Sequence, residues 1–265
     1  MILAGKIAIV YGGGGVIGGE IARTFAREGA RVHVAGPTAE KLEKVVTAIR
    51  TAGGNAHAAV LDVLDAAATA RHAEAVAREW GRVDVALSAV GFMHVQGKPL
   101  LELSLEEYEK PVAEFGRAQF SVAKAVAPHM AKQGSGALLF ISTPGSVRAY
   151  QGVLGFATAC AALEGFTRQL AGELGPSGVR VVCLRPDAIP ETVRRGSYAR
   201  RVFAPAAERA GLTLEAMMAT VPEGNLLKRE IRLSDVAEAA AFAASDRGGA
   251  LTATTLNLSN GSVVG

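Results

Sequence analysis

The stretch Ile7-Ala-Ile-Val-Tyr-Gly-Gly-Gly-Gly-Val-Ile-Gly-Gly-Glu-Ile-Ala22 decides the fold of this chain. It begins with an apolar run over 7–10, which is typical of a buried parallel strand. Six glycines follow between Gly12 and Gly19, and apolar residues then recur at helical spacing until Gly29. A strand, a glycine turn and a helix in this order predict the start of a dinucleotide-binding unit.

The glycine spacing indicates a phosphate site at the start of that helix. Gly13-x-Gly15-x-x-Gly18 satisfies the pattern G-x-G-x-x-G. Glycines let the backbone turn tightly and approach a pyrophosphate, while the helix N-terminus supplies free N–H groups and the positive end of a dipole. The alternative is a glycine-rich hairpin without a ligand, but the flanking strand and helix favour the phosphate site.

The composition favours one α/β domain over residues 1–265. The chain is 49% hydrophobic and 20% charged, and its net charge of +3 does not demand a nucleic-acid partner. No apolar run approaches the roughly 18 residues that span a bilayer, and the first residues do not resemble a signal peptide. Cys160 and Cys183 lie in apolar stretches without metal-ligand spacing. We therefore expect a cytoplasmic protein without a metal or a membrane partner.

Apolar runs alternate with helical patterns along the rest of the chain. We expect strands at 31–35, 56–61, 83–87, 137–141, 179–184 and 254–258, and helices at 38–51, 66–80, 104–132, 157–174 and 234–245. Pro111 and Pro128 should kink or restart the longest helix. This alternation predicts a single doubly wound Rossmann-type domain, in which helices cover both faces of a parallel sheet.

The stretch 190–232 interrupts the alternation. It follows the C-terminal end of an expected strand, where open α/β sheets bind ligands, so it is expected to form a substrate lid. A long surface insertion is the alternative. The stretch carries Arg194, Arg195, Arg200 and Arg201. These side chains either receive an anionic tail, such as a coenzyme A or carrier-protein phosphate, or form a solvated face.

Six stretches occur in an order typical of one known family. They are Tyr11–Gly18, Asp62-Val63, Ser88–Gly91, Ala161–Arg168, Arg185-Pro186-Asp187 and Leu256–Gly261. In this order they resemble the short-chain dehydrogenase/reductase family. The resemblance implies a Rossmann fold, an NAD(P) coenzyme, hydride transfer on a small-molecule substrate, and assembly as a homodimer or homotetramer.

The resemblance also implies a set of coenzyme contacts. By position these are Gly12, Gly13, Gly15, Ile17, Gly18, Thr38, Asp62, Val63, Gly91, Pro186 and Ile189. The family's second glycine is replaced by Val16. An acidic residue that would accept a ribose 2′-hydroxyl is replaced by Gly36, and Thr38 is placed to bond a 2′-phosphate, so the sequence favours NADP over NAD.

The positions of the family's catalytic residues differ more. When the chain is aligned on Ala161–Gly165, Phe156 takes the position of the catalytic Tyr, Cys160 that of the Lys and Thr143 that of the Ser. Phe115 takes the position of the Asn. Phenylalanine has no proton to give, and cysteine is not cationic at neutral pH. Only Thr143 keeps a hydroxyl for the substrate.

Other side chains are candidates for the missing proton donor. Tyr150 is either a displaced acid or part of the pocket wall, and Tyr198 is a weaker candidate. His94 is suited to proton transfer by its ordinary pKa but also fits a surface loop. Cys160 is either a nucleophile or a packing residue. Asp187 is either a polar pocket group or a turn residue.

Two functions are consistent with these residues. The first is an NAD(P)-dependent oxidoreductase with an atypical active site. In it Thr143 holds the oxygen of a carbonyl, alcohol or enone, and the proton comes from water, Tyr150 or the substrate. The second is a protein that binds a dinucleotide or an apolar ligand without redox chemistry, as a pseudoenzyme, partner subunit, cyclase or isomerase. Phe115 and Phe156 would line an apolar pocket in that case.

Overall fold

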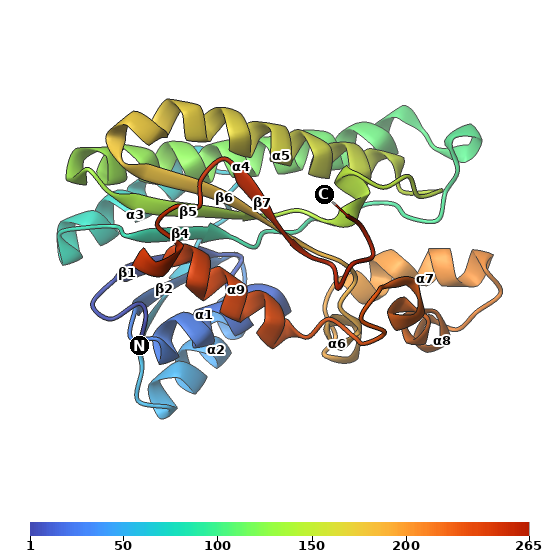
Figure 1. The fold of residues 1–265 in the computed structure, drawn as a ribbon, viewed down its shortest axis with the longest axis horizontal. Coiled ribbons are helices and arrows are strands. Elements are labelled where there is room, and N and C mark those ends of the chain that lie inside the picture. Colours follow the sequence, from blue (N-terminus) through green and yellow to red (C-terminus); the bar gives the residue numbers. More distant parts are fainter. Residues whose placement is uncertain (265) are drawn as a thin grey trace.

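A seven-stranded parallel sheet forms the centre of the protein. The computed structural model describes residues 1–264 and orders the strands β3-β2-β1-β4-β5-β6-β7 (Figure 1). The strands are β1 (Ile7–Tyr11), β2 (Arg31–Gly36), β3 (Asn55–Val60), β4 (Val85–Ser88), β5 (Gly136–Ile141), β6 (Val179–Pro186) and β7 (Thr254–Leu258). Strand order reverses between β1 and β4, and ligands bind at such a switch point in open α/β sheets.

Helices cover both faces of this sheet. One face carries α1 (Val16–Arg27), α2 (Ala39–Thr51) and α9 (Leu233–Ala244), and the other carries α3 (Ala66–Trp80), α4 (Leu105–Gln133) and α5 (Leu154–Leu174) (Figure 1). The predicted doubly wound, Rossmann-type architecture is therefore confirmed. No helix in the described part of the chain combines the length and apolar character needed to cross a bilayer.

The side chains of β1 pack alternately against the two helical layers. Val10 is fully buried in the core beneath α1, α2 and α9, whereas Ile9 and Tyr11 are fully buried on the opposite side. Successive side chains in a strand point to opposite faces, so a strand that is covered on both sides must be apolar throughout. This explains the uninterrupted apolar run that opens the chain.

The longest helix does not restart at its prolines. Helix α4 is continuous from Leu105 to Gln133 and contains both Pro111 and Pro128. Each proline removes one backbone hydrogen bond. Because α4 packs along both α3 and α5, these tertiary contacts hold the helix together across the missing bonds.

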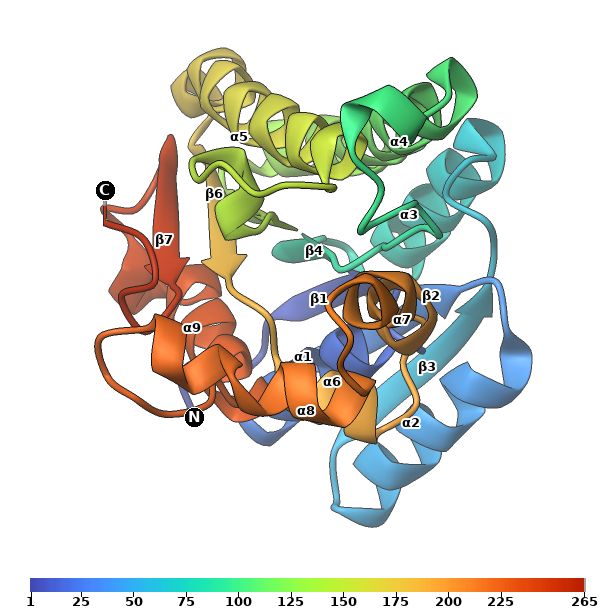
Figure 2. The same cartoon turned by 90° about the vertical axis from the view of Figure 1, so that its right-hand side faces the viewer.

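The stretch 190–232, expected to be a lid, consists mainly of short helices. We call it the α6–α8 segment, after α6 (Pro190–Arg194), α7 (Ala199–Arg209) and α8 (Leu214–Ala219). Val193, Ala207, Leu214 and Met218 form a small core of its own. Figure 2 shows these helices in front of the C-terminal ends of the strands. The segment therefore lies over the edge of the sheet where a ligand is expected.

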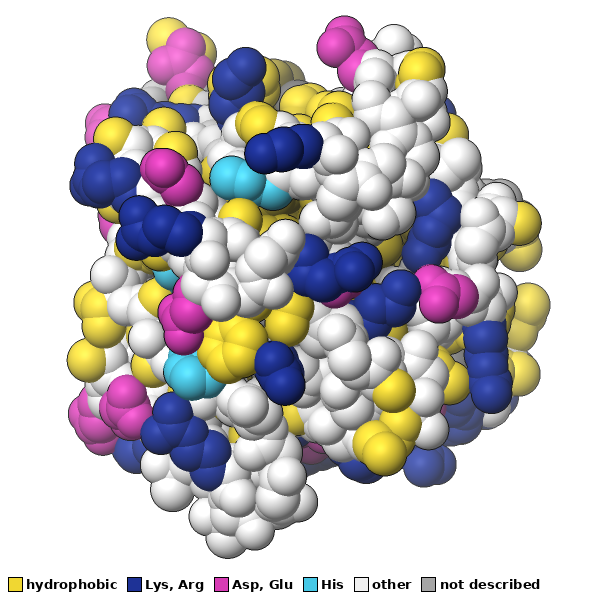
Figure 3. Space-filling view, turned by 90° about the vertical axis from the view of Figure 1, so that its left-hand side faces the viewer, with side chains coloured by type: hydrophobic (Ala, Val, Ile, Leu, Met, Phe, Trp, Pro, Cys, Tyr) yellow, Lys and Arg dark blue, Asp and Glu magenta, His cyan; other side chains and the backbone are white. Residues whose placement is uncertain are grey.

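The face opposite this segment has mixed surface chemistry. In Figure 3, the Lys and Arg side chains are separated by acidic, hydrophobic and uncharged groups. The face drawn there does not present the continuous basic surface that favours nucleic-acid binding.

Candidate functional site

The glycine loop after β1 forms a close-packed cradle. Gly12 has a φ of +76°, and a Cβ on it would lie 2.7 Å from the carbonyl carbon of Ala89. A Cβ on Gly18 would lie 2.4 Å from the carbonyl oxygen of Gly12. Larger residues would push the loop away from the start of α1, so these glycines are required by the geometry of the turn.

The start of α1 is suited to an anion. Gly15 is the N-cap residue and provides no side-chain hydrogen bond to the first turn. The first N–H groups of a helix have no acceptor within the helix, and the dipole makes this end positive. Ile17 and Gly18 lie in this turn. The cradle therefore fits the pyrophosphate of a dinucleotide.

The other predicted coenzyme residues lie at the same edge of the sheet. Asp62 and Val63 follow β3, Gly91 follows β4, and Pro186 ends β6 with Ile189 just beyond it. The carboxylate of Asp62 accepts a hydrogen bond of 2.9 Å from the backbone N–H of Leu64, which fixes the turn. The fold thus brings together the positions assigned by resemblance, and their contact with a coenzyme stays a prediction.

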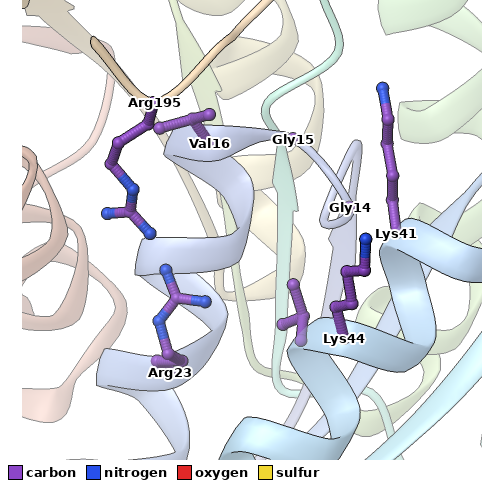
Figure 4. Close-up of a pocket in the computed structure, with 8 residues that line it drawn as sticks. Gly14, Gly15, Val16, Arg23, Lys41, Lys44 and Arg195 are labelled. Carbon is purple, nitrogen blue, oxygen red and sulfur yellow. The ribbon is translucent and has the colours of Figure 1, made fainter. Parts of the chain in front are cut away.

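A basic pocket lies beside the glycine loop, between α1 and α2. It encloses about 240 Å³ and is lined by Gly14, Gly15, Val16, Arg23, Lys41, Lys44, Val45 and Arg195 (Figure 4). Figure 4 shows Arg23 on α1, the two lysines on α2, and Arg195 beside Val16. No sequence pattern predicts this pocket, because its side chains come from three separate segments.

Carboxylates neutralise part of this pocket. Arg23 pairs with Glu20 at 2.7 Å, and Arg195 from the α6–α8 segment reaches the same carboxylate at 3.4 Å. Burial would raise the pKa of Glu20, but its bonds to the two arginines hold that pKa below its usual value. Lys44 pairs with Glu40 at 2.7 Å. Among the described residues, no ion pair involves Lys41, whose ammonium is therefore available to an anionic ligand.

The predicted catalytic positions come together at the ends of β5 and α5. The Thr143 hydroxyl donates to Cys160 Sγ at 3.5 Å. The ring of Phe156 lies edge-on to Phe115, with 5.7 Å between their centroids. Phe156 and Cys160 are four residues apart on α5 and so share one face of that helix. The arrangement provides one hydroxyl, one thiol and an apolar wall.

His94 belongs to this wall. Its ring stacks on Phe156 with 4.0 Å between centroids, and the residue is only 8% exposed. Nδ1 lies 2.8 Å from the carbonyl oxygen of Phe92 and must therefore carry the proton, while the amide of Gln96 donates to Nε2 at 3.0 Å. Burial lowers the pKa of His94. The expectation of a surface-loop histidine is wrong, because this side chain is a buried, neutral, fully bonded group.

The thiol of Cys160 is suited to packing. The residue is 1% exposed, and burial raises its pKa to about 11. A protonated thiol is a poor nucleophile. The environment therefore favours the packing role over nucleophilic catalysis.

Tyr150 lies beside a polar group near the end of the chain. Arg148 stacks on its ring at 4.9 Å, and burial together with the Asp187 carboxylate raises the pKa of its phenol. Asp187 accepts hydrogen bonds from the backbone N–H of Ala188, at 2.7 Å, and from the Ser262 hydroxyl. Asp187 therefore joins its own turn to the stretch around Ser262, and 39% of the Tyr150 surface is exposed.

The side chain of Tyr198 lies closer to the candidate site than its place in the sequence indicates. It lies just before α7, yet a Cβ placed on Gly91 would be 2.0 Å from its hydroxyl oxygen. Gly91 is one of the predicted coenzyme contacts, so a phenol from the α6–α8 segment lies on the floor of the candidate site. No local sequence signal predicts this contact, since it depends on how the segment folds back.

Comparison with known proteins agrees with this geometry. A family model described as enoyl-(acyl carrier protein) reductase matches residues 14–262. The short-chain reductase protein NovJ of Streptomyces niveus is 31% identical, over 97% of this chain and 93% of that protein. Hydroxynaphthalene reductase arp2 of Aspergillus fumigatus is 33% identical, over 92% and 87% of the respective chains.

A solved structure shows the same fold. The short-chain type dehydrogenase/reductase from Mycobacterium ulcerans aligns with a TM-score of 0.86 at 24% identity, over 99% of this chain and 91% of that chain. The family model and the two similar reductases each match more than nine-tenths of this chain. The chain therefore belongs to the short-chain dehydrogenase/reductase family of NAD- or NADP-dependent oxidoreductases.

Proposed function

We propose that this protein reduces a carbonyl group or an activated carbon–carbon double bond of a small molecule with NADPH, in an atypical active site. The observation that carries the proposal is that the glycine cradle, Gly91 and Thr143 follow the C-terminal ends of three neighbouring strands, β1, β4 and β5. The cradle and the N-terminus of α1 would hold the pyrophosphate. When bound, the coenzyme would supply the hydride.

The preference for NADPH rests on the basic pocket. A 2′-phosphate adds negative charge near the end of β2, where Gly36 provides no carboxylate to repel it. Thr38 is the N-cap residue of α2, but its hydroxyl makes no capping bond and is therefore available to a phosphate. Lys41 lies one turn further along α2, without an ion-pair partner in the described chain. These two side chains would recognise the phosphate.

The residues around the substrate position favour reactions that do not depend on a proton donor on α5. Thr143 would hold the substrate oxygen, while Phe156 and Cys160 replace the Tyr and Lys that the family resemblance predicts there. Loss of a positioned general acid costs about 10²–10⁴-fold in rate. Activated ketones, quinones and enones would suffer less from this loss than simple ketones.

A second candidate function is binding without redox chemistry. The rings of Phe92, Phe115, Phe156 and His94 form one connected wall, with centroid separations between 4.0 and 5.7 Å. Such a surface suits an apolar ligand that needs shape and orientation rather than proton transfer.

Coenzyme titration followed by a double substitution separates the two functions. NADPH and NADH are titrated by fluorescence, with thermal stability measured alongside, and NADPH-dependent turnover is then assayed with activated carbonyl compounds. Micromolar binding and turnover support the reductase. Failure of both coenzymes to bind at millimolar concentration would overturn it.

The Phe156→Tyr, Cys160→Lys double variant tests the atypical site directly. If the site is a reductase that has lost its α5 acid, the double variant gains reduction of simple ketones. If the variant instead abolishes binding of an apolar ligand, the aromatic wall is the functional surface and the second candidate function is favoured.

A further inference from the structure

The hydroxyl of Tyr198 is directed into the candidate site. A Cβ on Gly91 would lie 2.0 Å from the phenol oxygen, 2.6 Å from Cζ and 2.8 Å from Cε1. The end of the side chain, rather than its base, therefore lies against Gly91. The residue is 38% exposed, so solvent also reaches it.

The other proton-bearing groups near this position are already engaged. The single hydroxyl proton of Thr143 is directed to Cys160 Sγ, and its proposed role is to hold the substrate oxygen by a hydrogen bond rather than to protonate it. The Nδ1 proton of His94 goes to the carbonyl of Phe92, and its Nε2 accepts from Gln96. Within the described part of the chain, by contrast, no hydrogen bond engages the Tyr198 hydroxyl. The proton of this phenol is therefore free to be donated to a ligand that lies against Gly91.

The environment keeps this phenol protonated. Burial, followed by the nearby Cys160 thiol, raises the pKa of Tyr198 to about 12. A group that holds its proton throughout the physiological range is suited to give it to a developing alkoxide, which is a much stronger base. The same property makes it a poor base for alcohol oxidation.

We propose that Tyr198 is the proton donor of this site, in place of the tyrosine that Phe156 replaces. The inference rests on the proposed reductase function. A bound dihydronicotinamide would supply hydride to the carbonyl carbon; the C=O π bond would break, and the oxygen would take the proton from Tyr198. The O–H bond of Tyr198 breaks in this step, and the phenolate regains a proton from solvent. The products are the alcohol and the oxidised coenzyme.

This role differs from that of Tyr150. Tyr150 stacks against Arg148 near the Asp187 turn, whereas Tyr198 lies against Gly91, one of the predicted coenzyme contacts. A donor on the α6–α8 segment would reach its position only when that segment lies over the sheet. Proton transfer would then be coupled to closure of the segment over the substrate.

The test compares Tyr198→Phe with the wild type, using Tyr108→Phe as the control. Tyr108 lies on α4, outside the positions assigned to coenzyme and substrate, so its variant should match the wild type. For Tyr198→Phe we expect kcat to fall by about 10²–10⁴-fold, with little change in KM or in the Kd for NADPH. Wild-type kcat in Tyr198→Phe, or the loss in Tyr150→Phe instead, would overturn the proposal.

A spectroscopic measurement separates this proposal from the reductase function itself. Ultraviolet difference spectra on NADPH addition should show a tyrosine perturbation in the wild type that is absent in Tyr198→Phe. If the wild type binds NADPH but reduces no carbonyl compound, the reductase proposal fails. If turnover occurs and the difference spectrum is the same in both proteins, only the assignment to Tyr198 fails.

A final variant tests whether the Tyr198 ring only blocks the position of the coenzyme. If the Tyr198 ring merely fills the coenzyme groove, Tyr198→Ala will bind NADPH more tightly and keep full turnover. That result would overturn the donor role. We expect Tyr198→Ala to lose turnover as Tyr198→Phe does.

Discussion

Glu164 and Arg185 form a bidentate ion pair directly behind the candidate site. Arg185 Nε donates to Oε1 at 2.8 Å and Nη2 to Oε2 at 2.6 Å, and both side chains are only 5–6% exposed. The hydroxyls of Ser142 and Ser146 also donate to Oε1. Because these serines flank Thr143, the pair joins β6, α5 and the loop that carries the hydroxyl proposed to hold the substrate.

Removal of one partner from this pair should be severely destabilising. Glu164→Leu leaves the Arg185 guanidinium buried without its carboxylate, and the expected loss is about 3–5 kcal/mol of unfolding free energy. Burial would raise the pKa of Glu164, but the bonds from Arg185, Ser142 and Ser146 hold it below its usual value. This contribution is therefore present at neutral pH and is lost as pH falls through the lowered pKa.

Urea denaturation of Glu164→Leu beside Glu173→Leu measures this effect. Glu173 lies on the same helix and is exposed, so its replacement should change stability little. Equal stability of the two variants would show that the buried pair contributes no more than a surface carboxylate.

Gly18→Ala should disrupt the glycine cradle. The new Cβ would lie 2.4 Å from the Gly12 carbonyl oxygen and 2.9 Å from its carbon, so the loop must move away from α1. We expect coenzyme affinity to fall by at least about tenfold, since the backbone N–H groups no longer converge on the phosphates. Fluorescence titration with NADPH measures the loss.

Gly172→Ala is the matched control for this change. A Cβ at Gly172, on α5, meets nothing within 4 Å. This variant should gain about 0.5–1 kcal/mol of stability from its helix position and keep full affinity. Unchanged NADPH binding by both variants would mean that the cradle does not hold the coenzyme.

Lys41→Gln should affect the affinity for NADPH and the affinity for NADH differently. Loss of one charged contact to a 2′-phosphate is expected to weaken NADPH binding by about tenfold and to leave NADH binding unchanged. Lys44→Gln serves for comparison, because Lys44 is already paired with Glu40 at 2.7 Å and should contribute less. Equal losses for NADPH and NADH in Lys41→Gln would contradict phosphate recognition by this side chain.

A buried histidine cluster should make the fold sensitive to acid. His33 stacks on His57 at 5.2 Å and lies 6.3 Å from His72, whose ring is 5.8 Å from Tyr11. His33 Nε2, both ring nitrogens of His72 and the Tyr11 hydroxyl are buried without a hydrogen-bond partner in the described chain. Burial, together with neighbouring histidines at His33, lowers the pKa of His33 and of His72 to about 4.

The sign of this pH dependence follows from proton uptake on unfolding. In the unfolded chain these histidines regain a pKa near 6.5, so unfolding takes up protons below that pH. Stability should therefore fall between about pH 6.5 and pH 4 and level off below. His72→Phe removes one of the two groups, and its unfolding free energy, measured by urea denaturation at each pH, should depend less steeply on pH. A slope identical to that of the wild type would rule out this contribution of His72.

The fold was predictable where local signals agree with packing. Helix α3 begins after Asp65, whose carboxylate accepts the Ala68 N–H, and ends at Gly81, whose φ is +78°. Its observed range equals the predicted one. Helix α5 begins at Leu154, three residues earlier than predicted. The prediction missed this start because no capping side chain marks it.

The candidate site was predictable only where position along an element determines it. Thr143, Phe156 and Cys160 were placed by their spacing from a helix motif, and the fold brings them together. The Tyr198–Gly91 contact and the basic pocket depend on how distant segments pack. Arg194 and Arg200 likewise pair with Glu230 and Glu215, which no local pattern identifies.

The contact of Arg195 with Glu20 connects the α6–α8 segment to the first helix at the edge of the basic pocket. If the segment opens and closes as the predicted lid, an anion held there by Arg195 would bind the closed form more tightly than the open one. By thermodynamic reciprocity, closure must then raise the anion's affinity by the same factor by which the anion favours closure. Coenzyme occupancy and access of substrate from solvent would therefore be governed by a single equilibrium, with Arg195 as the residue that couples them.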